Sequence, residues 1–513
     1  MKGAFMHRRA SFDLVVRPWM AVRWKNPGVD RPGSVGLRDL LIHAHEIEAL
    51  TVTPPPALSA LYRLLYALTA RITGLDEDLD GADWDERRED LFGKPLDADA
   101  VRRYFVSLPG RFDLFDAERP FLQDPRLADP SVSSKSAGVN KLAIGRPAGN
   151  NSVWFSHHWD ATPEPLPSAE AVAAMLIWLY YGPSGRCASR THLDVKAADV
   201  AAGPLRSSLS YHPEGSTLLE TLLAGLTPPP RGLRREDDPC PWEVPDLPDP
   251  LAPPRQPLPY PGPCSRLTGA WQHALLLVPD DTGDQVLDAY ITWGKRAKQP
   301  DTGDAYVVHQ LSKQGNLYAR PAMSGRALWR DLDALLQLDN TAGSQPRRPE
   351  VLNDLDDLGV FTVRALGFEQ DGKTKDIQFV SAATPPLLFR IREYAPRTAR
   401  RIGDLRTAGE MYGQRLEYAA KRAWASVTDG KLGACAWAEH ASAAYWPAAD
   451  DLFWDRLQRQ DFTEDAWRDF LRAATSAYDL VTADYARNIR TARAIEHARL
   501  ELCGGQRKTK RTA

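Results

Sequence analysis

The chain has 513 residues, of which 43% are hydrophobic, and a formal net charge of −3. This length exceeds what one hydrophobic core usually serves, so we expect two or three domains, and the charge argues against a protein that coats nucleic acid with its whole surface. No apolar run reaches the length of a membrane span and the start lacks a signal-peptide pattern, which predicts a cytoplasmic protein with no membrane partner. The five cysteines show neither a zinc spacing nor a disulfide framework.

The first part of the chain predicts a mixture of strands and helices. Residues 11–24, SFDLVVRPWMAVRW, are typical of short strands around Pro18. Helical spacing of apolar residues then predicts one helix that starts near Gly36 and ends before Pro54, and a second helix over residues 58–72.

Two histidine pairs are candidate catalytic or metal-binding groups. His43 and His45 lie two positions apart in the first predicted helix, where side chains point about 200° apart, whereas helical zinc sites use positions i and i+4. We interpret them as structural residues. His157 and His158 precede an Asp in a loop, but no nucleophile accompanies them, and an exposed recognition loop is the simpler interpretation. A metal-dependent nuclease or hydrolase that uses either pair is the alternative function.

A predicted helix over residues 168–181 runs into a loop of small residues. Because this glycine loop follows a helix and does not join a strand to a helix, it is not a nucleotide-binding fingerprint. It either ends the helix or allows a phosphate backbone to come close. The glycine loop consists of Gly182, Pro183, Ser184 and Gly185.

Residues 227–266 are so rich in proline that we expect an extended surface excursion.

The segment GFEQDGKTKD, residues 367–376, lies between two runs of alternating apolar residues. Asp-Gly between such runs is a strong hairpin signal, because a tight turn needs the positive φ that glycine adopts without strain. The polar side chains of Gln370, Asp371, Lys373 and Lys375 are longer than a structural turn requires. The hairpin tip is therefore a candidate contact surface.

Beyond Pro386 the composition changes to Ala, Arg, Leu and Glu, with helical spacing and almost no strand signal. We expect an α+β chain, with a mixed α/β domain over residues 1–384 and a four-helix bundle over residues 385–505. The last eight residues, 506–513, form a basic tail. The predicted helices cover residues 403–428, 433–459, about 463–485, and 486–503.

Basic residues are concentrated at the start of this C-terminal region. They form either a solvated helix face or a surface that follows phosphate groups. The arginines considered for the second role are Arg397, Arg400, Arg401 and Arg406.

Five segments of the chain are informative when they are taken together in order: FDLVVRPWMAVRW, GLRDLLIHAHEIEAL, RFDLFDAERPFLQDP, RALWRDLDALL, and RALGFEQDGKTKD ahead of TPPLL. In this order the chain resembles, from about residue 11 to 500, the large-subunit (CasA) family of the type I-E CRISPR Cascade complex. The resemblance implies a non-catalytic protein of antiviral defence. No cofactor is expected, and no metal either, because the cysteines of the zinc knuckle that some relatives carry are absent here. The resemblance also implies recognition of the protospacer-adjacent motif beside the sequence read by the guide. The implied partners are guide RNA, double-stranded target DNA, the backbone and small Cascade subunits, and a recruited helicase-nuclease.

The resemblance also assigns roles to particular residues. The family's wedge, a hairpin tip inserted into the duplex, falls on Gln370, Asp371, Gly372 and Lys373, with either Gln370 or the Gly372–Lys373 pair in the lead. The glycine loop, which in the family lies near the minor groove of the motif, corresponds to residues 182–185 and has fewer glycines than in other members.

Two further elements complete the implied surface. A long loop that contacts the handle of the guide RNA corresponds to residues 130–165, and the aromatic rings at its tip can stack on an unpaired base. Its expected tip residues are Trp154, Phe155 and His157. The candidates for a lysine finger at the motif are Lys295, Lys298 and Lys313.

Overall fold

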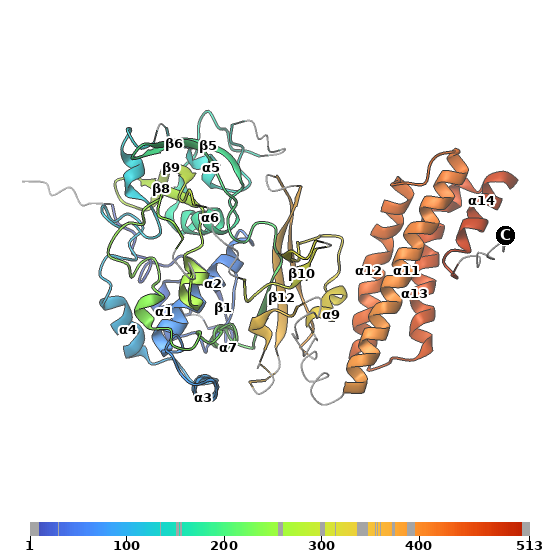
Figure 1. The fold of residues 1–513 in the computed structure, drawn as a ribbon, viewed down its shortest axis with the longest axis horizontal. Helices are drawn as coiled ribbons and strands as arrows, with labels where there is room; N and C mark the ends of the chain where they lie inside the picture. The colour runs from blue at the N-terminus through green and yellow to red at the C-terminus, as the bar shows by residue number, and fades with distance from the viewer. Residues whose placement is uncertain are drawn as a thin grey trace, which may run out of the picture. The chain divides into compact units, whose positions relative to one another are not determined.

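The computed structural model divides the chain into two compact units, one of Met1–Ala322 and Pro349–Ser381, the other of Met323–Arg348 and Ala382–Ala513. Figure 1 shows the elements of each unit. No helix of the described residues is long and apolar enough to cross a membrane. The side chains of residues 333, 396–399 and 464 are not described. The structure describes residues 10–28, 30–133, 135–149, 153, 156–254, 260–297, 303–312, 314–335, 347–353, 355, 358–359, 361–371, 375–386 and 396–504.

Helix α2 (Ala57–Thr73) is the centre of the first unit. Nearly all its residues are buried, because apolar residues predominate and its two arginines, Arg63 and Arg71, are paired with Asp304 and Asp76. It ends at Gly74, whose φ of +72° favours glycine at a helix C-terminus. Helices α4, α6, α7 and α8 pack against it. The bounds of these four are Ala98–Val106, Ser168–Tyr181, Leu218–Ala224 and Pro263–Thr268.

The predicted helices over residues 58–72 and 168–181 are confirmed as α2 and α6. The single helix expected from Gly36 to Pro54 is wrong. The chain turns after α1, and β3 then pairs antiparallel with β1, which buries Ile47 and Leu50. Strand pairing therefore overrides the helical spacing. The remaining elements before α6 are β1 (Met20–Trp24), β2 (Ser34–Val35), α1 (Leu37–Ile42), β3 (Ile47–Leu50), α3 (Gly81–Leu91), η1 (Pro125–Ala128), α5 (Val139–Leu142) and β4 (Leu166–Pro167).

The strands form small sheets, one early in the chain and the others in the later part of the first unit. Their strand orders are β2-β1-β3, β4-β9-β8 and β13-β12-β7, with β5-β6 and β10-β11 as two-stranded sheets. The predicted strands on either side of the Asp-Gly turn are confirmed as neighbours in one sheet, while residues 372–374 between them lie outside the described residues. These elements are β5 (Gly185–His192), β6 (Val195–Val200), β7 (Ser210–Glu214), η2 (Arg235–Asp237), β8 (His273–Pro279), β9 (Gln285–Trp293), β10 (His309–Leu311), β11 (Leu317–Ala319), η4 (Glu350–Leu352), β12 (Thr362–Asp371) and β13 (Lys375–Ala383).

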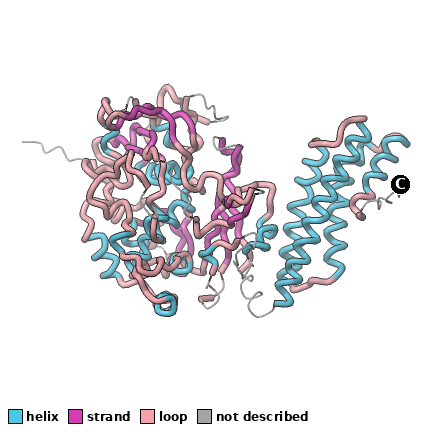
Figure 2. The backbone as a smooth tube through the Cα atoms, in the orientation of Figure 1, coloured by secondary structure: helices cyan, strands magenta, loops and turns pink. Residues whose placement is uncertain are grey.

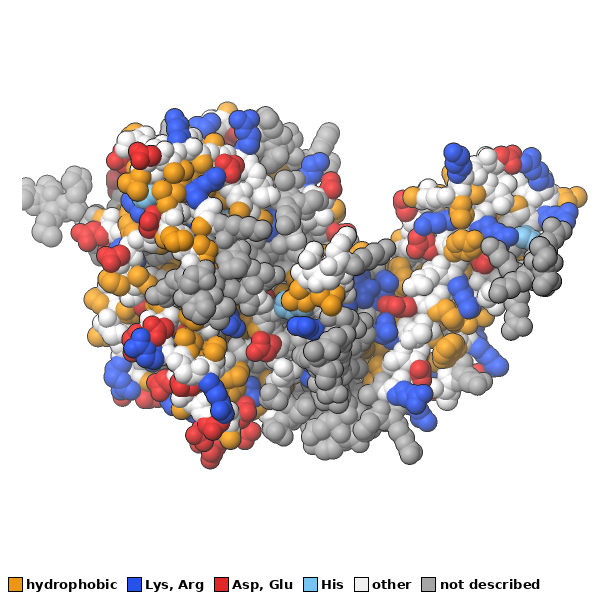
Figure 3. Space-filling view, viewed as in Figure 1, with side chains coloured by type: hydrophobic (Ala, Val, Ile, Leu, Met, Phe, Trp, Pro, Cys, Tyr) orange, Lys and Arg blue, Asp and Glu red, His pale blue; other side chains and the backbone are white. Residues whose placement is uncertain are grey.

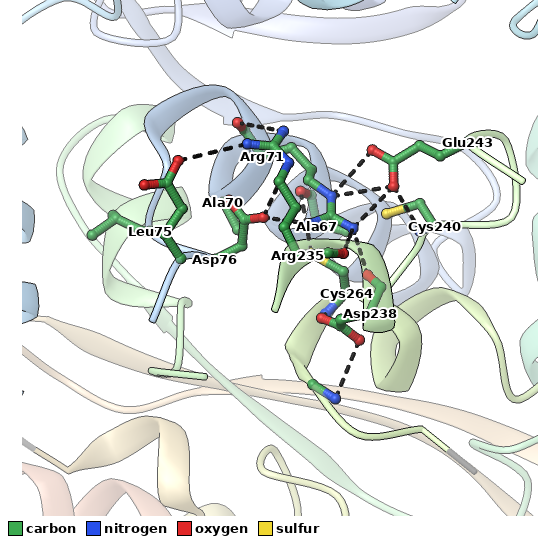
Figure 4. A network of polar contacts seen from close by, with 12 residues as sticks. Ala67, Ala70, Arg71, Leu75, Asp76, Arg235, Asp238, Cys240, Glu243 and Cys264 are labelled. Carbon is green, nitrogen blue, oxygen red and sulfur yellow. Dashed lines mark hydrogen bonds and ion pairs between the residues drawn. The ribbon is translucent and has the colours of Figure 1, made fainter. Parts of the chain in front are cut away.

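The proline-rich segment, residues 227–266, is partly buried, so its description as an extended surface excursion is wrong. Figure 4 shows its anchor, the Arg71 side chain of α2, which contacts Glu243 at 3.0 Å and donates to the carbonyl of Asp238. Trp242 is 3% exposed and packs on the ring of Phe121. A buried guanidinium and a buried indole thus hold the segment against the core.

The C-terminal region is helical, as expected, and Figure 2 shows it as helices joined by short loops. The mixed α/β character of the chain with a helical C-terminal region is therefore confirmed. The segment starting at Met323 belongs to the same unit, because Trp329 is fully buried and stacks on Phe453 with ring centroids 4.9 Å apart. The elements of this unit are η3 (Leu328–Asp331), α9 (Leu332–Leu335), α11 (Pro396–Thr428), α12 (Ala436–Gln458), α13 (Glu464–Thr482), η5 (Ala483–Tyr485) and α14 (Ile489–Arg499).

Candidate nucleic-acid interface

A cleft of about 1010 Å³ in the first unit brings together residues that are far apart in the sequence. Ser184 of the glycine loop, Ser207 and Lys295 all line it, and Tyr318 of the β10–β11 sheet contributes a ring that is 43% exposed. Two of the surfaces expected from the sequence, the glycine loop and one lysine candidate, therefore share one cleft.

The glycine loop lies directly on strand β8. A Cβ atom added to Gly182 would come within 2.5 Å of both the Trp178 carbonyl oxygen and His273 Cε1, so a larger residue does not fit there. Gly185 has a φ of +130° and no atom near its missing side chain, so glycine is needed there for its backbone conformation. Close packing fixes one end of the loop, and the other end is open.

His273 supports the glycine loop through a hydrogen bond. Its Nε2 lies 3.1 Å from the carbonyl oxygen of Pro183. Burial lowers the pKa of His273 to about 4, so the ring is neutral near pH 7. Because a carbonyl oxygen only accepts, Nε2 carries the proton and donates it to the loop.

Lys295 follows strand β9 and is turned toward the protein. Its ammonium donates to Tyr260 Oη at 2.8 Å and to the carbonyl oxygen of Gly269. Burial lowers the pKa of Lys295 to about 8. The other two lysine candidates, Lys298 and Lys313, lie outside the described residues.

The strand ends beside the turn of the β12–β13 hairpin are fixed by a polar network. Gln370 donates from Nε2 to Asp376 at 3.0 Å, and its Oε1 accepts from Ser207 Oγ at 3.4 Å. Arg206 pairs with Asp376 at 2.9 Å and donates to the carbonyl of Tyr181, the residue before the glycine loop. Burial lowers the pKa of Arg206, and the Asp376 carboxylate opposes this effect. The hairpin and the glycine loop are therefore linked through Arg206.

Of the four expected wedge residues, Gln370 is held beside the turn by Asp376 and Ser207, and Asp371, the last residue of β12, is exposed. Gly372 and Lys373 lie outside the described residues.

The cleft carries an excess of positive charge. Arg63 pairs with Asp304 at 2.8 Å, and Arg296 pairs with Asp199 at 3.2 Å. Lys295, in contrast, donates to neutral oxygen atoms only within the described ranges. Elsewhere on the first unit, on the face seen in Figure 3, basic and acidic side chains are interspersed. An uncompensated cation beside a loop of small residues suits a phosphate or a base edge.

The expected handle-contacting loop is described only in part. Trp154 and Phe155 lie outside the described residues, whereas His157 is exposed. Trp159, to which the sequence assigned no role, is 72% exposed, and its carbonyl accepts from Asn140 Nδ2 at 3.1 Å. The backbone thus holds Trp159 in place while its ring faces solvent.

The four arginines of the C-terminal region do not share one environment. Arg400 and Arg401 of α11 are exposed, and the side chain of Arg397 is not described. Arg406 has only 21% of its side chain exposed and pairs with Glu410, which also binds Arg330 at 3.2 Å. Arg406 therefore belongs to an ion-pair network inside its own unit.

Neither histidine pair gathers the ligands of a metal site. His43 Nδ1 lies 3.2 Å from Glu46, and His158 lies 3.2 Å from Glu164. Within the part of the chain that the structure describes, no three His, Cys, Asp or Glu side chains come together as a metal-binding group.

Sequence reasoning missed two residues of the cleft, Arg206 and Ser207, and also His273, which contacts the glycine loop. No motif marks them, because their partners lie between 25 and 170 positions away. Ser207 has a φ of +74°, an unusual conformation for a residue other than glycine, and such strain often accompanies functional sites. This signal is visible only in the structure.

Comparisons with known proteins agree with this architecture. A family model described as CRISPR-associated protein Cse1 matches residues 13–483. The CRISPR-associated protein CasA/Cse1 of Thermus thermophilus is 29% identical over 488 residues, which cover 90% of each chain. A chain of a solved CRISPR RNA-guided surveillance complex is 38% identical, with a TM-score of 0.86 over 96% of this chain and 100% of that one. The solved CasA (Cse1) of Thermus thermophilus, at 22% identity, has a TM-score of 0.73 over 96% of this chain and 98% of its own, and shows the shared fold. The chain belongs to the family of CRISPR-associated protein Cse1.

Proposed function

We propose that this protein is the non-catalytic large subunit of a type I-E Cascade complex, which recognises the protospacer-adjacent motif in double-stranded DNA and opens the duplex beside it. The similarity to a chain of an RNA-guided surveillance complex supports membership of such an assembly. The observation that carries the motif-reading role is the cleft, in which Ser184, Lys295 and Ser207, the partner of Gln370, lie together.

In this proposal the glycine loop lies against the DNA backbone and Lys295 reads the motif. To reach the DNA, the ammonium of Lys295 exchanges Tyr260 Oη and the Gly269 carbonyl for an acceptor on a base or phosphate. Because both present acceptors are neutral, no ion pair has to be broken. The close packing of Gly182 on His273 keeps the glycine loop in position while Lys295 changes its hydrogen-bond acceptors.

The hairpin acts as the wedge. The contacts of Gln370 with Asp376 and Ser207 favour a supporting role for Gln370 and a leading role for Asp371, Gly372 and Lys373. A hairpin whose strand ends are fixed beside the turn loses little conformational entropy on insertion, so more of its contact energy is available for unstacking.

The other assignments complete the proposal. Residues 130–165 contact the handle of the guide RNA through Trp154, Phe155 and His157, with exposed Trp159 as a further stacking residue. Helices α11, α12, α13 and α14 form the four-helix bundle of the family, and Arg400 and Arg401 follow a DNA strand. The subunit also contacts the backbone and small subunits and helps to recruit the helicase-nuclease.

The motif-reading role is tested with Lys295→Met in the assembled complex. We expect the ratio of affinities for duplexes with and without the motif to fall about tenfold, since a base-edge contact contributes about 1–3 kcal/mol. Lys94→Met, which removes a 67% exposed lysine paired with Asp90, is the matched control and should keep the ratio. Equal weakening on both duplexes would show that Lys295 contributes general affinity only.

The metal-dependent nuclease alternative has a direct test. Purified protein incubated with DNA and divalent cations should show no turnover that a chelator abolishes. Chelator-sensitive cleavage that His43→Ala or His158→Ala removes would establish the alternative.

A further inference from the structure

Helix α8 forms part of the wall of the cleft that carries the proposed motif-reading role. Pro263, Arg266 and Leu267 of this helix line the cleft, and their spacing of i, i+3 and i+4 places them on one helical face. All six residues of α8 are described, and five of them are buried. Arg266 is the exception, so this face of α8 presents one accessible charged group to the cleft.

The Arg266 guanidinium is anchored along one edge. Its Nε donates to the carbonyl oxygen of Tyr260 at 3.2 Å, and its Nη2 donates to the carbonyl oxygen of Pro261 at 3.4 Å. A guanidinium has five N–H donors, and among the described residues Arg266 Nη1 has no hydrogen-bond partner. The side chain is therefore held in place while donors remain for a ligand.

Arg266 also lacks the counter-charge that other arginines of the cleft have. Three of them each pair with an aspartate within 3.2 Å: Arg63 with Asp304, Arg206 with Asp376, and Arg296 with Asp199. Of the Lys and Arg side chains that line the cleft in the described part of the chain, Arg266 and Lys295 donate to neutral oxygen atoms only. An anion can bind to such a cation without breaking an ion pair.

Tyr260 links the two unpaired cations. Its carbonyl oxygen accepts from Arg266, and its phenol oxygen accepts from Lys295 at 2.8 Å. The two side chains thus lie at opposite ends of one residue and line the same cleft. They differ in chemistry, because a guanidinium binds two phosphate oxygens at once, whereas an ammonium acts as a point charge.

The glycine loop continues into a second surface of small residues. Ala201, Ala202 and Gly203 also line the cleft, and the Gly203 N–H donates to the carbonyl oxygen of Gly182 at 2.9 Å. A Cβ atom added to Gly203 would lie 2.5 Å from the Tyr180 carbonyl oxygen, so a larger residue does not fit there. Side chains as short as these leave room in the cleft for a sugar-phosphate backbone.

We propose that Arg266 is a phosphate-binding residue, which holds one phosphodiester group of the target duplex in the cleft while Lys295 contacts a base edge. The inference deepens the proposed function of the cleft and rests on it. Arg266 then contributes affinity that is independent of sequence, whereas Lys295 contributes discrimination. Because its edge is already anchored, the guanidinium loses little freedom when the phosphate binds.

The proposal is tested with Arg266→Gln in the assembled complex. We expect affinity to fall about fivefold for duplexes with and without the motif, and the slope of log affinity against log salt to shrink by about 0.9. Arg119→Gln is the matched control, because Arg119 also donates to backbone carbonyls, those of Val244 and Pro245, but does not line the cleft. Full affinity with an unchanged slope in Arg266→Gln would overturn the proposal.

Arg266→Lys separates the charge from the anchoring role. It keeps the cation and loses the edge that binds the Tyr260 and Pro261 carbonyls, so we expect the slope of the wild type. If Arg266 served only to hold the chain, both variants would be weakened equally and neither slope would change. That result would also overturn the proposal.

The phosphate is located with duplexes in which a neutral methylphosphonate replaces one phosphate at a time, in and beside the motif. One position should weaken binding of the wild type about fivefold and leave that of Arg266→Gln unchanged. Absence of any position with this difference would contradict the assignment. Release of the subunit from the complex by Arg266→Gln, with an unchanged DNA slope, would assign the residue to the guide RNA instead and would likewise overturn it.

Failure of this inference is distinguishable from failure of the proposed function. If Lys295→Met lowers motif discrimination and Arg266→Gln changes nothing, the inference alone is wrong. If the wild-type complex binds duplexes with and without the motif equally, the proposed function is wrong. The methylphosphonate series then still decides whether Arg266 binds a DNA phosphate.

Discussion

Arg206 of the cleft and two arginines of helix α11, Arg400 and Arg401, are held in opposite ways. Arg206 has 1% of its side chain exposed, and its contacts with Asp376 and the Tyr181 carbonyl are fixed. Arg400 and Arg401 are exposed. A buried cation with fixed partners determines the shape of a site, whereas exposed cations contribute a field that salt screens. The cleft is therefore suited to discriminating duplexes that carry the motif from those that do not, and α11 is suited to general affinity for DNA.

The largest effect is expected for Arg206→Met. The substitution leaves the Tyr181 carbonyl and Asp376 without their partner, and we expect a loss of about 2 kcal/mol in the free energy of unfolding. The 40% exposure of Asp376 limits the loss, because water replaces part of the interaction. Urea denaturation of the isolated chain measures it. Arg231→Met, at an 82% exposed arginine paired with Asp80, is the control and should change the midpoint little. A midpoint unchanged by Arg206→Met would show that the network does not stabilise the cleft.

Neutralising Arg400 and Arg401 together should weaken DNA binding by the complex to a similar degree for all sequences. The slope of log affinity against log salt should shrink by about 0.9 for each phosphate that the helix no longer neutralises. Arg459→Gln with Arg472→Gln removes two arginines that are 71% and 75% exposed and serves as the control. An unchanged slope with full affinity would identify the α11 arginines as a solvated face. Arg406→Gln should instead lower stability, because Arg406 pairs with Glu410.

The pH dependence of motif discrimination should follow Lys295. Its pKa of about 8 means that the ammonium loses its charge as the pH rises from 7 to 9, and discrimination should fall over that range. Lys295→Arg, which stays charged, should flatten the profile. The free energy of unfolding should change in the opposite direction. Between pH 8 and 10.5 the unfolded chain binds the Lys295 proton that the folded chain has released, so stability rises with pH over this range. A discrimination profile with the same pH dependence in Lys295→Met would exclude this residue as its cause.

The smallest effect is expected at Ser207. Ser207→Ala and Ser207→Gly both remove the hydroxyl that donates to Gln370, but only glycine relieves the φ of +74°. We expect the glycine variant to be more stable than the alanine variant by about 1 kcal/mol. Both should slow duplex opening slightly if the hydroxyl positions Gln370. Wild-type rates of duplex opening in both variants would show that the Ser207 hydroxyl does not position Gln370.

Much of the fold follows from local patterns. The apolar run of α2, the helix of residues 168–181 and the C-terminal helices all have the spacing that their structures require. The strand after α1 could not be foreseen, because its pairing with β1 involves residues more than twenty positions away. The position of Trp329 was also hidden, since its partner Phe453 is far along the chain.

The site was predictable only as separate pieces. The glycine loop and the Asp-Gly hairpin carry local signals, and Lys295 is the first of three lysine candidates. Their meeting in one cleft depends on Arg206 and His273, which have no sequence signal because their contacts join separate segments of the chain. The unequal environments of Arg401 and Arg406 likewise depend on Glu410 and Arg330.

The wedge offers the most direct test of the central claim, which is that a fixed hairpin beside the cleft opens the duplex. Gln370, Asp371 and Lys373 are replaced together by Ala, and R-loop formation by the assembled complex is measured on two linear duplexes. The duplexes differ only in the first base pairs beside the motif, which are paired in one and mismatched in the other. Unstacking costs about a few kcal/mol per base step, and the mismatches remove this cost from the substrate. We expect a strong defect on the paired duplex and a much smaller one on the mismatched duplex. An equal defect on both would contradict the claim.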